Sequence, residues 1–161
     1  MAYEFYVTVE GTRQGKLKGE SARDAHADKL TGLSFRYSVG SPREASSGMA
    51  TGRRTHQPVS FVKEWGAASP QLFTALTTNE SCKSVLFEFV GTDDSGQEHV
   101  FHTIKLVNAL ITEIEQYVEP GDTGPLEKTG PLEKISFTFQ RIEIENIDGQ
   151  TRAIDDWRGP R

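Results

Sequence analysis

Apolar residues alternate with polar ones along most of this chain, a spacing that predicts β-strands with one buried face. The alternation covers residues 3–10, 33–39, 59–65, 84–90, 99–118 and 135–147. Near the end, Asp148 and Gly149 are typical of a hairpin turn before a final strand, TRAIDDW. We therefore expect a mainly β protein.

One segment changes its period. In residues 56–76, HQPVSFVKEWGAASPQLFTAL, apolar residues fall at every second position before Gly66, with Lys63 breaking the row. After Ser69 they fall at every third or fourth position, which predicts a helix. Ser69 is suited to cap the first helical turn, and Pro70 is suited to its first position. The segment predicts one strand followed by one short helix.

Two of the long strands are predicted to bend. The apolar residues of 99–118 change parity near 108–110, and those of 135–147 change parity after Phe139. A bulge or break of this kind lets a strand curve around a barrel. We predict a single domain over residues 1–161, a small β-barrel of two packed antiparallel sheets with one short flanking helix.

A long polar segment, residues 40–57, separates two of the predicted strands. Loops beyond about 12 to 15 residues are uncommon in compact domains unless they bind something. Arg43, Arg53 and Arg54 outnumber Glu44, so the segment carries 3 − 1 = +2 against −5 − 2 = −7 for the rest of the chain. This protruding loop is a basic feature on an acidic body, and we expect it to attract another copy of that body.

Composition limits the partners. A formal charge of −5 argues against nucleic acid or an anionic membrane as the main partner. No apolar run approaches the roughly 18 residues of a membrane helix. MAYEFYVTVE at the start lacks the basic and apolar parts of a signal peptide, so we expect synthesis in the cytoplasm without one.

Candidate reactive groups give no catalytic pattern. His99 and His102 lie three positions apart on a predicted strand and point to opposite faces, which disfavours a metal site. Glu143 and Glu145 have a spacing near that of glycosidase carboxylates, but Arg141 shares their face, which favours a charged surface or subunit contact.

The single cysteine, Cys82, excludes an intrachain disulfide framework and is expected to be a small packed side chain. Trp65 and Trp157 are expected to be core residues first. The GPLEK repeat at 124–128 and 130–134 predicts an elongated surface loop. We expect no catalytic residue, metal or cofactor, and the remaining pattern is that of a subunit that works by assembling.

The order of several motifs resembles one family. KGES at 18–21, His26, LSFRYSV, the long polar loop, PVSFVKEWGAASPQLFTAL and EKISFTFQRIEIE together resemble the haemolysin co-regulated protein (Hcp) family, the tube subunit of bacterial type VI secretion. The resemblance runs from residue 3 to residue 157, and its most specific part is the strand that leads into Ser-Pro and a helix.

The resemblance implies hexameric rings that stack into a hollow tube, which a contractile sheath drives behind a spike protein. It further implies export by this machine, with small effectors in the lumen. The loop is then expected to reach the next ring through Arg43, Glu44, Arg53, Arg54 and His56. Expected lumen-facing residues are Ser34, Arg36 and Ser38. Two alternatives stay open: a phage-type tail tube protein, and a carbohydrate-binding or hydrolytic β-domain that uses Trp65 with Glu143 and Glu145.

Overall fold

The computed structural model describes residues 4–21, 26–118, 120–121, 124–128 and 130–157. Its single described helix is α1 (Ser69–Thr77). The described strands are β1 (Glu4–Gly11), β2 (Gly15–Lys16), β3 (Leu30–Gly32), β4 (Ser34–Arg36), β5 (Val39–Gly40), β6 (Thr55–His56), β7 (Val59–Glu64), β8 (Cys82–Thr92), β9 (Glu98–Tyr117), β10 (Pro120–Gly121), β11 (Gly124–Lys128), β12 (Leu132–Thr138), β13 (Arg141–Asn146) and β14 (Thr151–Asp156). The predicted mainly β fold with one helix is confirmed.

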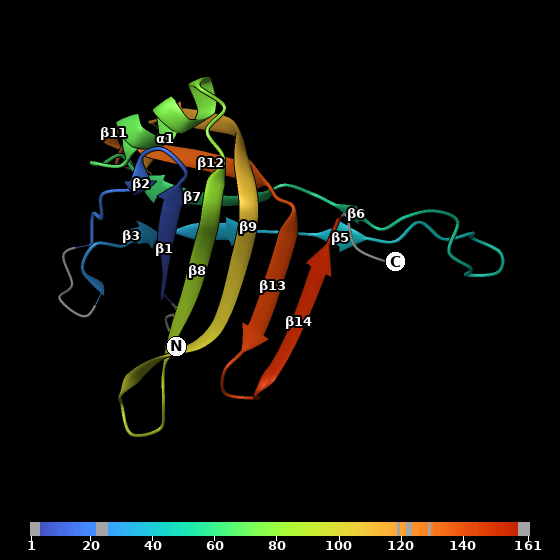
Figure 1. Cartoon of the computed structure of the whole chain (residues 1–161). Coiled ribbons are helices and arrows are strands. Elements are labelled where there is room, and N and C mark those ends of the chain that lie inside the picture. The colour runs from blue at the N-terminus through green and yellow to red at the C-terminus, as the bar shows by residue number, and fades with distance from the viewer. Residues whose placement is uncertain (1–3, 22–25, 119, 122–123, 129, 158–161) are drawn as a thin grey trace.

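Ten of the described strands form one antiparallel sheet that folds over itself. Its order is β2-β1-β8-β9-β12-β7-β4, with β13 also on β9, β14 on β13 and β3 on β1. The first layer contains β1, β8, β13, β14 and the N-terminal half of β9; the second contains β4, β7, β12 and the C-terminal half of β9. In Figure 1, β7 and β12 run across the direction of β8 and β9. The core lies between the layers.

The bend of β9 joins the two layers. The first half of this strand pairs with β8 up to Ala109, and the second half pairs with β12 from Leu110 onward. Asn108 has a left-handed backbone with φ of 51°, a conformation that asparagine adopts more readily than most residues. The predicted break at residues 108–110 is confirmed. The stretch 135–147, expected to be one bent strand, is instead two strands, β12 and β13, one in each layer.

Residues 30–36 connect the two ends of the folded sheet. β3 pairs with β1 and β4 pairs with β7, so the chain changes layers at Leu33. The continuous strand predicted over 33–39 is therefore wrong. Phe35 packs on the core, but Leu33 and Val39 are 54% and 51% exposed because the chain leaves the sheet on both sides of β4.

The core is apolar and rich in phenylalanine. Phe61, Phe87 and Phe137 are buried between the layers, and their rings contact one another. The prediction that both tryptophans belong to the core is wrong, since Trp65 is 45% exposed and Trp157 is 40% exposed. Both lie where a strand has ended, so no facing layer covers them.

The predicted helix is confirmed, with its cap displaced by one residue. Ala68 is the N-cap and makes no side-chain cap bond, while Pro70 lies in the first turn as expected. Leu72 and Ala75 face the core. Ser69 does not cap the helix, because its hydroxyl belongs to a buried polar cluster described below.

The two GPLEK copies have different structures. The first copy forms β11, which pairs with β10 away from the main sheet. The second copy enters β12, where Glu133 is fully buried. The expectation of a surface loop is therefore wrong for the second copy, because its residues pair with both β7 and β9.

Candidate assembly surfaces

The polar loop is a protruding hairpin rather than a structureless segment. β5 pairs with β6 at its base, and Arg43 pairs with Ala50 further out. The backbone amide of Glu44 donates to the carbonyl of Met49 at 2.8 Å, which closes the tip. Figure 1 shows the hairpin extending from the side of the molecule opposite β3 and the start of β1.

Asp155 of β14 fastens the base of the hairpin to the body. Arg54 donates two hydrogen bonds to the Asp155 carboxylate, at 2.5 and 2.6 Å. His56 places Nε2 at 2.6 Å from the same carboxylate and Nδ1 at 2.6 Å from the Tyr37 hydroxyl. The Trp157 ring packs at 5.1 Å from the imidazole. We call this set the hairpin latch.

The electrostatics of the latch favour an ionised Asp155. The hydrogen bond from Arg54 is the largest influence and lowers the pKa of the Asp155 carboxyl. Burial, followed by the charge of Asp155, raises the pKa of the Tyr37 hydroxyl. Arg54 and His56, expected to contact another ring, are therefore paired within their own chain, and their visible role is to orient the hairpin.

The outer part of the hairpin carries the groups that remain accessible. Met49 is 67% exposed. Among the described residues, the Arg43 side chain donates only to the carbonyl of Gly48, at 3.2 Å, and the Arg53 side chain only to the carbonyl of Trp157, at 3.4 Å. Glu44 accepts hydrogen bonds from two neighbouring serines, which lower the pKa of its carboxyl. The tip therefore presents cations beside one exposed apolar side chain.

The second layer has a polar outer face. Ser34 and Arg36 lie opposite Val62 and Ser60, and directly opposite residues of antiparallel strands point to the same side. The register continues through β12 to the acidic end of β9, with these members of the face: Lys134, Ser136, Glu113 and Glu115. Ser38 does not belong to it, because β4 ends at Arg36 and the carbonyl of Ser38 pairs with Gln57 at the hairpin base.

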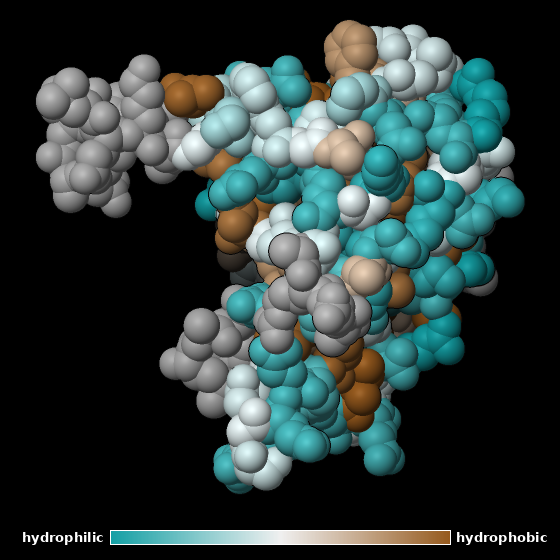
Figure 2. Space-filling view, turned by 90° about the vertical axis from the view of Figure 1, so that its left-hand side faces the viewer, coloured by the Kyte–Doolittle hydropathy of each residue, from teal (hydrophilic) through white to brown (hydrophobic). Residues whose placement is uncertain are grey.

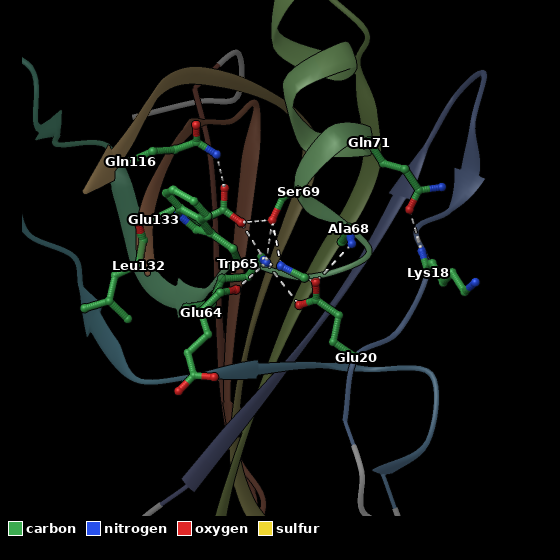
Figure 3. Close-up of polar contacts among 12 residues, drawn as sticks. Lys18, Glu20, Glu64, Trp65, Ala68, Ser69, Gln71, Gln116, Leu132 and Glu133 are labelled. Carbon is green, nitrogen blue, oxygen red and sulfur yellow. Dashed lines mark hydrogen bonds and ion pairs between the residues drawn. The ribbon is translucent and has the colours of Figure 1, made fainter. Parts of the chain in front are cut away.

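A buried polar cluster fixes the turn between β7 and α1 (Figure 3). The Lys63 ammonium is fully buried and lies 2.7 Å from the Glu133 carboxylate and 3.0 Å from that of Glu20. It also donates to the carbonyl of Glu64 at 2.8 Å. The Ser69 hydroxyl donates to Glu133 at 2.5 Å. This is the Lys63 cluster.

Glu20 links the cluster to the start of the helix. Its carboxylate accepts from the backbone amide of Ala68 at 3.0 Å, which satisfies an amide at the positive end of α1. An added Cβ at position 66 would collide with the Glu20 carboxylate, so a larger residue there has to displace that side chain from the cluster. In the sequence pattern, Lys63 was visible only as an interruption of an apolar row. A lysine on the inward-facing side of a predicted strand was the available signal of a buried ion pair.

A cavity of about 520 Å³ adjoins this turn. Its lining residues are Glu20, Thr31, Leu33, Glu64, Trp65, Gly66 and Ala67. The Trp65 indole is held in place by a 2.7 Å hydrogen bond from Nε1 to the carbonyl of Leu132. Figure 2 looks onto this side of the molecule, where hydrophobic side chains interrupt a mostly hydrophilic surface. We call the cavity the Trp65 pocket.

Comparison with known proteins decides the family. The family model described as "Type VI secretion system effector, Hcp" matches residues 6–145. The chain belongs to the Hcp family. A "Major exported protein" of Pseudomonas aeruginosa is 32% identical, with 99% of this chain and 98% of that protein covered.

The fold of this chain matches those of solved Hcp structures along nearly its whole length. One described as "Crystal structure of Hcp protein" has a TM-score of 0.89 at 28% identity, with coverage of 99% of this chain and all of the other. The secreted protein Hcp3 from Pseudomonas aeruginosa has a TM-score of 0.80 at 26% identity and covers 98% of this chain. This chain is thus an Hcp protein of type VI secretion with an exported relative, and Hcp proteins are a structural rather than an enzyme family.

The acidic pair of this Hcp protein has the character of a charged surface. Glu143 accepts from Arg152 and lies 3.0 Å from Arg141. Burial opposes ionisation, but the Arg152 hydrogen bond and the nearby cations hold the pKa of Glu143 below its usual value. A glycosidase acid needs the opposite shift. Trp65 lines its pocket in the other layer, without Glu143 or Glu145.

The remaining candidates in this Hcp protein are structural. His99 pairs with Asp148 at 2.9 Å and His102 with Asn146 at 3.3 Å. Within the described ranges, no group of three or more metal-ligating side chains occurs and no helix is long and apolar enough to cross a membrane. Cys82 is fully buried; burial and then Glu80 raise the pKa of its thiol to about 11, so it is not poised as a nucleophile.

Proposed function

We propose that this Hcp protein is a tube subunit of a type VI secretion system. Six copies form a ring, and rings stack head to tail into a hollow tube. Inside the cell the sheath surrounds this tube and the spike tips it; contraction exports the tube with small effectors in its lumen. The observation that supports assembly is a pair of sheet edges, on one layer, that lack a partner strand in the described pairings.

The second layer has one open edge on each side. In the described pairings, β4 pairs only with β7, and residues 111–117 of β9 pair only with β12. Two different edges on opposite sides suit a head-to-tail contact that closes into a ring by rotation. The edge of β4 in one copy then meets the edge of β9 in the next, and the second layers of all copies line one continuous wall.

The polar outer face supports the assignment of this wall to the lumen. A water-filled channel favours serine and charged side chains, whereas a subunit contact in the core of a ring favours apolar ones. Arg36 lies on β4 at one side of the face and Glu113 and Glu115 lie on β9 at the other, with Lys134 on β12 directly opposite Glu115. This division gives a passing effector both cationic and anionic contacts.

Ring formation is the first test. Light scattering coupled to gel filtration should give 6 × 17.9 = about 107 kDa, and electron microscopy should show a ring with an open centre. A particle that stays at 17.9 kDa at every protein concentration would contradict the proposal.

Stacking is tested separately. Replacement of residues 42–53 by a short Gly-Ser turn keeps the latch residues Arg54 and His56, so rings should persist while tubes are lost. High salt should weaken stacking more than ring closure, because exposed charges are screened beyond about 10 Å at 0.1 M. Normal tubes from the shortened variant would refute a stacking role for the hairpin.

The lumen assignment predicts an effect on cargo. Arg36→Glu reverses one charge on the polar face and should change effector retention without changing the ring. Lys83→Glu makes the same charge change on β8, in the first layer, where the lysine side chain is 62% exposed. Equal retention by both variants for every effector tested would remove Arg36 from the lumen.

A further inference from the structure

The structure points to a specific partner for the Trp65 pocket, and we infer that it receives the hairpin tip of a second copy in the next ring. This inference rests on the stacking proposed above and names the two surfaces that make it. Met49 enters the apolar part of the pocket, while Arg43 pairs with Glu64.

Position is the first support. β4 and β7 are antiparallel neighbours, with Ser34 opposite Val62 and Arg36 opposite Ser60. The hairpin joins these strands at the Arg36 end. The opposite end of the same two strands carries Leu33 and Glu64, which line the pocket. Because the hairpin and the Trp65 pocket lie at opposite ends of one strand pair, the hairpin of each copy can contact the pocket of the next, which gives a repeating head-to-tail contact along a tube.

Chemical complementarity is the second support. The pocket offers Leu33, 54% exposed, and the ring of Trp65, 45% exposed. The Met49 side chain is 67% exposed. Its neighbours Gly48 and Ala50 are small, so they do not block entry of the methionine into the pocket. Methionine adapts to irregular apolar cavities and makes favourable contacts with aromatic rings.

Charge selects the same pairing. The Glu64 side chain points away from the Lys63 cluster in Figure 3, and no described residue pairs with its carboxylate. Within the described part of the chain, the Arg43 guanidinium donates only to the carbonyl of Gly48, which leaves its other donors accessible. An arginine placed between a carboxylate and the face of a tryptophan gains from both.

Both surfaces are ordered before they meet. The latch orients the hairpin from Asp155, and a 2.8 Å backbone bond closes its tip. On the other side, Trp65 is held by the hydrogen bond from its indole to the carbonyl of Leu132 and by the bond from its backbone amide to the carbonyl of Pro131. Association then costs little extra conformational entropy, which favours binding through a small contact area.

Disulfide trapping tests the inference directly. Met49→Cys combined with Ala67→Cys places one thiol on the hairpin tip and one in the Trp65 pocket. The native Cys82 is fully buried and does not compete. Oxidation of assembled tubes should give a ladder on a non-reducing gel that extends beyond six subunits, because each subunit links to the next ring. Met49→Cys combined with Asp94→Cys, in an exposed turn, is the matched control and should give no ladder.

The outcomes separate this inference from the proposed function. A ladder that stops at six would place the hairpin in a neighbour of the same ring and overturn the inference. Tubes without a ladder, or equal ladders from the Ala67 and Asp94 variants, would also overturn it while leaving the tube function intact. Absence of rings in the wild-type protein would overturn the tube function itself.

A charge exchange supplies an independent readout. Glu64→Arg should raise the protein concentration needed for tube formation by roughly tenfold, which is about 1.4 kcal/mol for each ring added to the stack. Addition of Arg43→Glu should restore it, whereas Asp94→Arg alone should leave it unchanged. Failure of the double variant to recover any stacking, with rings intact, would refute the pairing of Glu64 with Arg43.

Discussion

Replacement of Lys63 by methionine is expected to be one of the most destabilising single changes in this protein. Methionine keeps a similar volume but removes the ammonium that contacts Glu133 at 2.7 Å and Glu20 at 3.0 Å. Glu133 is fully buried, so its carboxylate would keep only hydrogen bonds from Ser69 and Gln116. Removal of one partner from a buried ion pair costs about 3 to 5 kcal/mol.

That cost is large on the scale of a domain whose free energy of unfolding is about 5 to 15 kcal/mol. For a chain of this size, 1 kcal/mol lowers Tm by about 2 to 4 °C, so Lys63→Met should lower it by about 6 to 20 °C. The Tm should be measured by calorimetry at one fixed protein concentration, because ring assembly also contributes to stability.

Two further variants make the measurement decisive. Lys83→Met removes an exposed lysine and should change Tm little, since exposed ion pairs contribute about 0 to 1 kcal/mol. Lys63→Met combined with Glu133→Gln removes the unpaired buried charge and should recover part of the loss. A Tm for Lys63→Met within error of that for Lys83→Met would refute the assignment of Lys63 as the cation of a buried cluster.

Three other predictions concern separate parts of the fold. Gly66→Ala should destabilise by about 1 to 3 kcal/mol in urea unfolding, because its Cβ meets Glu20, while Gly40→Ala meets nothing within 4 Å and should not. Cys82, with a thiol pKa of about 11, should resist iodoacetamide at pH 8 until urea unfolds the protein. Because the folded state lowers the Asp155 pKa, the latch stabilises above the ordinary value of 3.8 and is lost as pH falls through the lowered value; Asp155→Asn should remove this contribution to the dependence of Tm on pH.

Much of the fold follows from local patterns. The alternating rows at 3–10, 59–65 and 84–90 correspond to β1, β7 and β8, and the change of period after Gly66 corresponds to α1. These patterns were informative because the spacing of side chains along a strand or helix depends only on near neighbours. The break at 108–110 was visible for the same reason.

Local sequence patterns predicted the candidate surfaces less well than they predicted the strands and the helix. The family resemblance implied a contact of Arg54 and His56 with another ring; their pairing with Asp155, 101 and 99 positions away in the same chain, had no local signal in the sequence. Lys63 was treated as an interruption, although its carboxylate partners come from another strand and from a loop 43 positions earlier. Leu33 has the same parity as Phe35, which packs on the core, yet Leu33 is exposed because the chain changes layers there.

The sequence by itself determined the strand-rich class, the position of the helix and the excess positive charge of one long segment. These are properties of residue spacing and composition, and no distant contact alters them. The tertiary structure decided which charges are buried in pairs, which apolar side chains stay exposed and how the hairpin and the Trp65 pocket come to lie at opposite ends of two strands. Each of these depends on the register between segments far apart in the chain, because burial and pairing are fixed only when the layers pack.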